Sequence, residues 1–424
     1  MSSEFKQNLE KYAEIIVKVG LNLQSGQRLL IGAPILTNDG TPLEFAPLVR
    51  LIVKKAYQIG ARFVDVMWGD EQLRLIRFQH APRDSFEEFP KWRIDAEVKI
   101  DEAGDADLVI VSSNPELLHE QDPELITKSQ QAFFKHMKPI SEFTSKNAMN
   151  WLSAPGATEG WANKVFPNIP QKSRITKLWD SIFKICRVKE EDPISAWRDH
   201  INQLSKRKDY LNNKKYTTMK MKAPGTDLTI GLPKGHIWVG GGLKTQNGID
   251  FIANMPTEEV FTLPHKNKTE GIVSSTKPLY YGGEIIEDFR LKFSKGRVIE
   301  VMAKKGRDFL LKTIDTDNGA RYLGEIALVP HSSPISQSNI LFYNTLIDEN
   351  AATHVALGRA RQFNLVNGET MSDDEFAEVG GNLSLIHKDF MIGSGEMDID
   401  GIKEDGTAEP IMRKGEWAFE VKLI

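Results

Sequence analysis

The spacing of apolar and polar positions changes near residue 213. Before that point, apolar residues recur every three to four positions in long segments, which predicts amphipathic helices. The helices expected there cover residues 5–19, 43–59, 84–101, 124–138 and 177–213. Short apolar runs between them predict strands at residues 27–32, 61–68 and 107–112, and residues 151–170 are expected to form a Pro-containing loop. Strands separated by helices pair in parallel with right-handed crossovers, so residues 1–213 are predicted to be an N-terminal α/β domain with a parallel sheet.

After residue 213 the chain runs in short alternating stretches that are broken by glycine. This pattern is typical of antiparallel strands and hairpins. Strands are expected at residues 227–231, 236–241, 288–293 and 296–303, with one helix near residues 306–313. Residues 214–424 are therefore predicted to be an α+β C-terminal domain with mainly antiparallel strands, and the boundary is a change of architecture.

Length and composition agree with two ordinary globular domains. The chain has 424 residues, too many for one hydrophobic core, with 40% hydrophobic residues and a formal net charge of −4. Without a basic excess to neutralise phosphates, nucleic acid is not an expected partner. The single cysteine, Cys186, cannot form an internal disulfide, which favours a reducing compartment. No signal segment or long apolar run is visible, so we expect a cytoplasmic protein that does not enter a membrane.

Two histidines near the C-terminus lie among carboxylates in mostly apolar segments. Residues 383–391 are expected to form a buried strand, in which His387 and Asp389 project from the same face because side chains alternate. An imidazole and a carboxylate together suit a divalent metal ion such as zinc, cobalt, manganese or iron. His354 is expected on a helix that begins near Asp348 or Asn350. Either histidine could instead be a hydrogen-bonded core residue, and nothing local decides between the two interpretations.

Three glutamates of the second half add further carboxylates to these two histidines and Asp389. Glu325 lies inside an otherwise apolar strand, and an ionised carboxylate is rarely buried unless it is paired or bound to a cation. Glu258 and Glu259 are adjacent and precede another apolar stretch, where each could be a surface charge.

Four segments of the second half resemble the successive motifs of a known family. They are Pro-Thr-Glu-Glu-Val-Phe-Thr (256–262), Leu-Gly-Glu-Ile-Ala-Leu-Val-Pro (323–330), Asn-Thr-Leu-Ile-Asp-Glu-Asn-Ala-Ala-Thr-His-Val-Ala-Leu-Gly (344–358) and Ser-Leu-Ile-His-Lys-Asp-Phe-Met-Ile-Gly (384–393). The stretch Trp-Ala-Asn-Lys-Val-Phe-Pro (161–167) is similar to a fifth motif. Together they resemble the M29 family of thermophilic metal-dependent aminopeptidases, the aminopeptidase T type, and the resemblance spans most of the chain.

The resemblance implies a metalloaminopeptidase that releases N-terminal residues from peptides. It implies a pair of divalent ions among Zn, Co, Mn and Mg, with Zn or Co expected, held by Glu259, Glu325, His354, His387 and Asp389. It also implies a homodimer whose domains enclose an inner chamber. Three carboxylates and two imidazoles suit two ions that share a bridging carboxylate and an activated water.

Two further residues are expected to act in catalysis. Glu258 is the candidate general base, because consecutive residues can direct one carboxylate to the metal and the next to the water. Arg361 stands where the family commonly has a tyrosine. Arg361 could stabilise an oxyanion by its charge, Tyr322 or Tyr343 could supply a phenol, or the activity could be weak or altered.

Two alternatives use the same residues. His354, His387 and Asp389 would also form the two-histidine, one-carboxylate triad of a mononuclear Fe(II) ring-cleaving dioxygenase of the dihydroxypyridine dioxygenase type, whose fold is similar. Glu259 and Glu325 favour the peptidase, because a mononuclear iron site does not need them. A metal-stabilised or chaperone-like dimer without turnover is the third interpretation.

Overall fold

The computed structural model describes residues 2–32, 40–112, 114–281 and 284–420, which fall into two compact units. The first unit comprises Met1–Asp199 and Gly242–Pro256, and the second comprises His200–Gly241 and Thr257–Ile424. The division into domains at residues 1–213 and 214–424 remains a prediction. Among the described residues, no helix combines the length and the apolar character that crossing a membrane requires.

The first unit is built around a four-stranded parallel sheet with the strand order β3-β1-β5-β6. Its strands are β1 (Arg28–Ile31), β3 (Phe63–Val66), β5 (Ala106–Val111) and β6 (Trp151–Pro155). Its helices are α1 (Ser3–Ile15), α2 (Ala46–Gln58), α3 (Glu71–His80), α4 (Lys91–Glu102), α5 (Pro123–Ser145), α6 (Glu159–Val165) and α7 (Gln171–Ile185). Two short pairs, β2 (Thr41–Pro42) with β4 (Trp68–Gly69) and β9 (Leu243–Lys244) with β10 (Asp250–Phe251), complete the unit. The predicted α/β architecture with a parallel sheet is confirmed.

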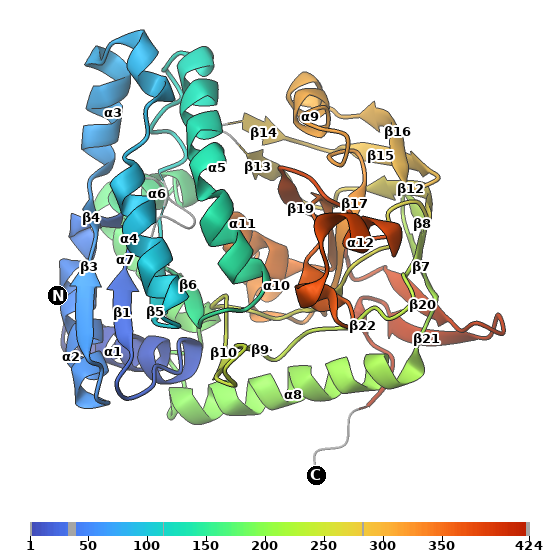
Figure 1. Ribbon diagram of the computed structural model, residues 1–424, viewed down its shortest axis with the longest axis horizontal. Helices are drawn as coiled ribbons and strands as arrows, with labels where there is room; N and C mark the ends of the chain where they lie inside the picture. Colours follow the sequence, from blue (N-terminus) through green and yellow to red (C-terminus); the bar gives the residue numbers. More distant parts are fainter. Residues whose placement is uncertain (1, 33–39, 113, 282–283, 421–424) are drawn as a thin grey trace. The chain divides into compact units, whose positions relative to one another are not determined.

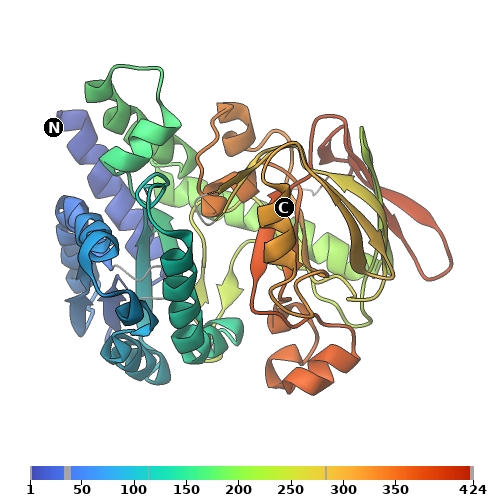
Figure 2. The same ribbon diagram turned by 90° about the horizontal axis from the view of Figure 1, so that it is seen from above.

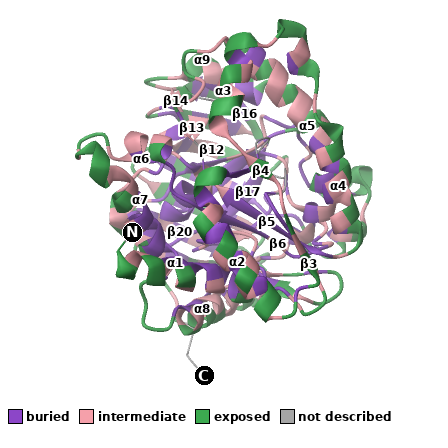
Figure 3. Cartoon of the chain, turned by 90° about the vertical axis from the view of Figure 1, so that its left-hand side faces the viewer, coloured by how far each residue is buried: buried purple, intermediate pink, exposed green. Residues whose placement is uncertain are grey.

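Both faces of the parallel sheet are covered, which explains why the central strands β1 and β5 are buried at nearly every position (Figure 3). Leu30 and Val109 pack with Ile100 of α4 on one face. The next residue of β5, Ile110, points to the opposite face of the sheet. There Ile110 and Phe45 both lie against Gly156. Asp107 lies two positions before Val109 on β5, so its side chain points to the same face of the sheet, toward α4.

Two local predictions in the first unit are wrong. The segment expected to be a loop at residues 151–170 contains β6 and α6. The helix expected at residues 177–213 is two helices, α7 and α8 (Pro193–Lys214). The break has a local cause: Asp192 accepts hydrogen bonds from the N–H groups of Ile194 and Ser195, and Pro193 occupies the first helical position, where its missing N–H costs nothing.

The second unit contains a large antiparallel sheet with the strand order β16-β15-β12-β8-β7-β20-β21-β22. In chain order these strands are β7 (Thr218–Ala223), β8 (Thr226–Gly231), β12 (Thr269–Ser274), β15 (Arg290–Ser294), β16 (Arg297–Met302), β20 (Asp398–Ile402), β21 (Ala408–Arg413) and β22 (Glu416–Trp417). Figures 1 and 2 show that this sheet joins yellow-green, amber and red segments, so strands far apart in the sequence lie side by side. The predicted antiparallel character of the second half is confirmed.

A smaller antiparallel sheet, with the order β11-β17-β18-β19, lies in the same unit. Its strands are β11 (Val260–Thr262), β17 (Leu323–Leu328), β18 (His354–Gly358) and β19 (His387–Met391). One face supplies Val260, Ile326, Val355 and Phe390 to the main hydrophobic core of the unit. The remaining elements are the hairpin β13 (Leu279–Tyr281) with β14 (Glu284–Ile286) and the helices α9 (Arg307–Ile314), α10 (Pro334–Ser338), α11 (Thr345–Asp348) and α12 (Asp373–Glu378). The strand expected at residues 236–241 forms only single bridges, from His236 to Leu365 and from Val239 to Phe261.

Candidate metal centre

His354 is the first residue of strand β18 and does not lie on a helix, so that prediction is wrong. The helical segment before it is short, because α11 ends at Asp348 and a 3-10 turn ends at Ala351. Strand β18 is buried at every position. A fully buried strand lacks polar alternation and cannot be distinguished from a buried helix by periodicity alone.

The register of the small sheet places four of the predicted residues on one face. Across β18, Ala356 is opposite Glu325 on one side and Asp389 on the other. His354 lies two positions from Ala356, and His387 lies two positions from Asp389, so both imidazoles share this face. Glu259 directly precedes Val260, whose side chain is in the core on the other face, so the alternation turns Glu259 toward the same four residues.

Small residues leave space between these side chains. Ala356 occupies the position between Glu325 and Asp389, and Gly358 is opposite His387. Gly358 has a φ of 102°, and a Cβ atom there would lie 2.1 Å from the carbonyl oxygen of Ile386. A larger residue is therefore excluded at position 358. The neighbouring Leu385, which was expected in a buried strand, is 72% exposed because β19 begins only at His387.

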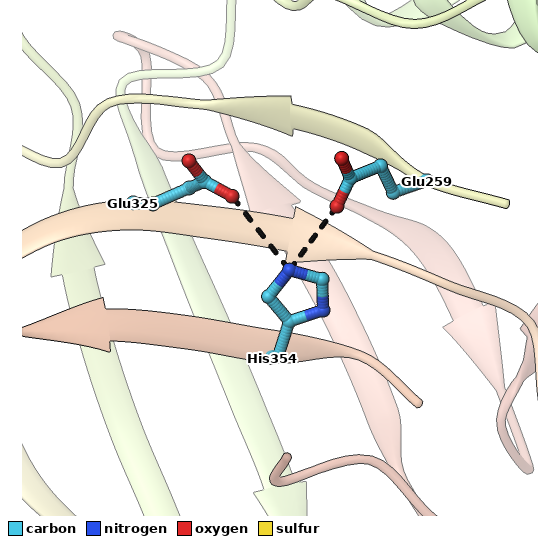
Figure 4. Close-up of side chains that lie close together, drawn as sticks. All are labelled: Glu259, Glu325 and His354. Carbon is cyan, nitrogen blue, oxygen red and sulfur yellow. Dashed lines mark ion pairs between the residues drawn. The ribbon is translucent and has the colours of Figure 1, made fainter. Parts of the chain in front are cut away.

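The carboxylate of Glu325 lies between the two imidazoles. Its Oε1 atom is 3.6 Å from Nε2 of His354, and its Oε2 atom is 3.6 Å from Nε2 of His387. Oε2 of Glu259 is 3.1 Å from Nε2 of His354, and Oδ1 of Asp389 is 3.4 Å from Nε2 of His387. Figure 4 shows the side chains of Glu259 and Glu325 on either side of the His354 imidazole. The result is two groups of three donors that share Glu325: Glu259, Glu325 and His354 form one, and Glu325, His387 and Asp389 form the other.

Both histidines direct Nε2 into the cluster because the backbone holds Nδ1. Nδ1 of His354 is 3.1 Å from the carbonyl oxygen of Ala352, and Nδ1 of His387 is 2.6 Å from that of Arg359. A carbonyl oxygen can only accept, so Nδ1 carries a proton, and in the neutral imidazole Nε2 holds the lone pair that a metal ion would bind. Metal-binding histidines are usually oriented in this way.

Donor atoms of the cluster lack hydrogen bonds, which fits a site for cations. Nε2 of His354, Oε2 of Glu259 and Oδ1 of Asp389 are buried, and no hydrogen-bond donor or acceptor from outside the cluster reaches them among the described residues. Buried polar atoms in folded proteins are otherwise nearly always satisfied. Imidazole and carboxylate donors at this spacing suit Zn²⁺, Co²⁺ or Mn²⁺.

The pKa values in the cluster follow from burial and from the mutual charges. Burial lowers the pKa of His354, but the carboxylates of Glu259 and Glu325 outweigh it and raise this pKa well above the ordinary value. Burial raises the pKa of Asp389, but His387 and His354 outweigh it and hold this pKa below the ordinary value. A divalent cation would replace the proton on the imidazole, since a metal and a proton compete for the same lone pair.

Glu258 lies beside the cluster and faces a different neighbour. Its Oε2 atom is 3.5 Å from Nε2 of His200 on α8, and its backbone N–H donates to Oδ1 of Asn350 over 2.7 Å. The latter bond ties the segment before β11 to the turn that precedes β18. The same Nε2 atom of His200 is 2.7 Å from the carbonyl oxygen of Thr257, so the imidazole contacts both Thr257 and Glu258.

One carboxylic acid near the cluster was not predicted from the sequence. Glu349 is buried, and burial together with the charges of Asp389 and Glu259 raises its pKa well above the ordinary value. The only sequence signal was a polar group of three residues, Asp-Glu-Asn (348–350), between the apolar pair Leu-Ile and two alanines. Asp348 beside it has a separate role, because its carboxylate accepts the backbone N–H groups of Phe342 and Asn344.

Arg361 lies close enough to the cluster for its charge to act on it. Burial lowers the pKa of His387, and the positive charge of Arg361 lowers it further, although Asp389 and Glu325 raise it more strongly. Of the two tyrosines considered, Tyr322 has the cationic groups of Lys266 and Arg297 over its ring, at 4.9 and 5.9 Å from the centroid. Tyr343 makes an edge-on contact with the ring of Tyr280.

Comparisons with known proteins found a family model, relatives and solved structures that are similar to this chain over nearly its whole length. A family model described as thermophilic metalloprotease (M29) matches residues 5–417. Aminopeptidase AmpS of Bacillus subtilis is 46% identical over 98% of this chain and 99% of its own length. The solved structure of wild-type AmpT from Thermus thermophilus has a TM-score of 0.90 at 41% identity and covers 98% of this chain and 100% of its own.

A more distant structure shares the fold alone. The 2,5-dihydroxypyridine dioxygenase from Pseudomonas putida KT2440 has a TM-score of 0.51 at 10% identity and covers 99% of this chain and 98% of its own. The fold similarity that the dioxygenase interpretation assumed is therefore present, but at this identity it carries no information about the reaction.

Proposed function

Because this chain belongs to the thermophilic metalloprotease (M29) family and is a hydrolase, we propose that it is an aminopeptidase with a dinuclear metal centre. The observation that carries the proposal is the position of Glu325, which presents one carboxylate oxygen to His354 and the other to His387. A carboxylate in that position suits a bridge between two cations.

In this proposal the two donor groups hold one divalent ion each. Glu259 and His354 would hold the first ion, His387 and Asp389 would hold the second, and Glu325 would contribute to both. When bound, a pair of Zn²⁺ or Co²⁺ ions would lower the pKa of a shared water toward about 7 and polarise the scissile carbonyl group. The donors support this assignment, because among the described residues the ion-pair distances of these atoms join them only to other members of the cluster.

The protein's own residues would complete the reaction. We assign Glu258 as the general base that accepts the proton of the attacking water and passes it to the leaving amine. Glu349 is the second candidate for this role, since its pKa responds to the charges of Asp389 and Glu259. Arg361 would stabilise the negative charge that develops on the carbonyl oxygen, and its effect on His387 supports its closeness to the reacting groups.

The substrate would be a peptide with a free N-terminus. The unprotonated α-amine of such a peptide could coordinate one of the two ions that Glu259, Glu325 and Asp389 would hold with the histidines. This interaction is not available to an internal peptide bond, and this would limit cleavage to the first residue. We further propose a homodimer, on the basis of the family resemblance, and a cytoplasmic location, because a single cysteine favours a reducing compartment.

One experiment separates this proposal from its alternatives. The purified chain should contain two Zn²⁺ or Co²⁺ ions after metal loading and should hydrolyse aminoacyl-p-nitroanilides. A single iron with ring-cleaving activity would favour the dioxygenase, and bound metal without either activity would favour a non-catalytic dimer. The closeness of Glu259 and Glu325 to the His354 imidazole supports the peptidase, because a mononuclear iron triad does not need these carboxylates.

A further inference from the structure

A second group of carboxylates lies in the first unit. Glu97 and Asp101 are four residues apart on α4, which places both on one face of the helix. Asp107 is on β5, and strand alternation directs its side chain toward α4, as it does Val109. One ligand atom from each residue lies within 4.8 Å of the others.

These three side chains are buried and unsatisfied. Their residues are 0%, 2% and 0% exposed, respectively, and among the described residues no hydrogen bond from outside the group reaches any of their six carboxylate oxygens. Within the group, the contact between Asp101 and Asp107 is a hydrogen bond only if one of them carries a proton. Glu97 in particular is completely buried and extends toward the two aspartates. More than 90% of buried polar groups in proteins have a partner, so six orphaned oxygens at one point require an explanation.

Elsewhere the same chain satisfies a buried carboxylate with protein donors. Asp348 in the second unit accepts one backbone N–H on each oxygen. In the first unit the charged groups acting on Asp107 are themselves carboxylates, namely Asp101, Glu97 and Asp105. Burial, followed by the charge of Asp101, raises the pKa of Glu97 to about 9. An added positive charge would remove this mutual repulsion.

We propose that Glu97, Asp101 and Asp107 form a binding site for one hard divalent cation of the Ca²⁺, Mn²⁺ or Mg²⁺ class, separate from the candidate metal centre of the second unit. Three atoms that are mutually within 4.8 Å lie no more than about 2.8 Å from a common point. Oxygen ligands bind Ca²⁺ at about 2.3–2.6 Å, so a small contraction would bring all three into range. Bidentate binding would engage all six oxygens.

The chemical composition of the group selects the class of ion. It contains oxygen donors alone, without imidazole or thiolate, and such groups prefer hard cations over Zn²⁺. The cation would join α4 to β5 and thereby stabilise the packing of the helix on the parallel sheet. This site is a structural one, and it does not depend on the proposed peptidase activity.

Luminescence of Tb³⁺, a probe for Ca²⁺ sites, tests the proposal in the full chain with its second-unit centre loaded with Zn²⁺. Trp151 is paired with Asp107 in the β5–β6 register, so its indole can transfer excitation to an ion bound beside Asp107. We expect Tb³⁺ emission that Ca²⁺ or Mn²⁺ displaces, and a thermal midpoint that rises when Ca²⁺ or Mn²⁺ is added.

The variants Asp107→Asn and Glu97→Gln should weaken cation binding about ten-fold or more, since affinity depends on ligand charge. They should keep their aminopeptidase activity, which shows that they fold. Glu102→Gln is the matched control, because Glu102 is exposed on the same helix. If both variants bind Tb³⁺ and Ca²⁺ as tightly as the parent, or if no ion changes the emission or the thermal midpoint of the parent, the three carboxylates hold protons and the proposal is wrong.

Discussion

Oε2 of Glu325 lies 3.6 Å from Nε2 of His387, while the other oxygen of the same carboxylate faces the opposite imidazole. The bridge in the proposed centre is thus a single side chain on the second strand of the small sheet. Removing its negative charge should affect both ions at once, which no other substitution in the cluster would do.

We expect Glu325→Gln to lower the metal content of the loaded protein and to reduce kcat by roughly 10³-fold or more, because the amide cannot bridge two cations. Metal analysis and p-nitroanilide hydrolysis measure the two effects. Glu300→Gln is the control, since Glu300 is an exposed strand residue of the same unit. Full metal content with normal turnover in Glu325→Gln would contradict the bridging role.

The general base can be identified with a pair of isosteric variants. Glu258→Gln should lower kcat by about 10²–10⁴-fold and leave the metal content unchanged, which is the usual effect of losing general base catalysis. Glu349→Gln should lower kcat by less than about ten-fold on the same scale. Initial rates at saturating substrate provide the comparison, and the opposite order would transfer the role to Glu349.

Arg361 should contribute through its charge. We expect Arg361→Ala to lower kcat by about 10²-fold and Arg361→Lys to recover a large part of this loss, since a lysine retains the charge but not the planar guanidinium. The metal content should stay the same in both variants. Equal activity of Arg361→Ala and the parent would show that the residue does not stabilise the transition state.

The stability of the second unit should depend on pH through Asp348. Burial raises the pKa of Asp348 to about 7, although the N–H groups of Phe342 and Asn344 oppose this shift. In the unfolded chain the pKa is about 3.9, so between roughly pH 4 and 7 the folded protein keeps a proton that the unfolded chain has lost. The contribution to stability is therefore fully present below about pH 4 and is lost as the pH rises toward 7.

Urea unfolding of the parent and Asp348→Asn at several pH values measures this effect. The asparagine cannot ionise, so the stability of the parent relative to the variant should fall by up to about 1.4 kcal/mol per pH unit between pH 4 and 7. Asp374→Asn, at an exposed position, is the control. A constant difference between parent and Asp348→Asn across this range would mean that Asp348 is ionised in the folded state.

Much of the architecture could be predicted from the sequence. Periodicity identified the elements of the parallel sheet except β6, whose run Trp-Leu-Ser-Ala-Pro is short and lies next to proline and glycine. It assigned His354 to a helix because the residues before it are good helix formers. The strand forms because β17 and β19 pair with it on both sides, and this is a non-local effect.

The sequence by itself determined the two architectures and, through the resemblance of its motifs, the residues expected at the metal centre. Only the tertiary structure decided which of them meet: strand register set Glu325 between His354 and His387. The packing of a helix and a turn placed His200 beside Glu258 and brought Glu349 within reach of the charge of Asp389. It also placed Asp107 against Glu97 and Asp101, which resemble a solvent-exposed helix face in the sequence. The physical reason is that alternation along a strand fixes the face of a side chain, whereas its neighbours on that face come from chain segments that pair far away in the sequence.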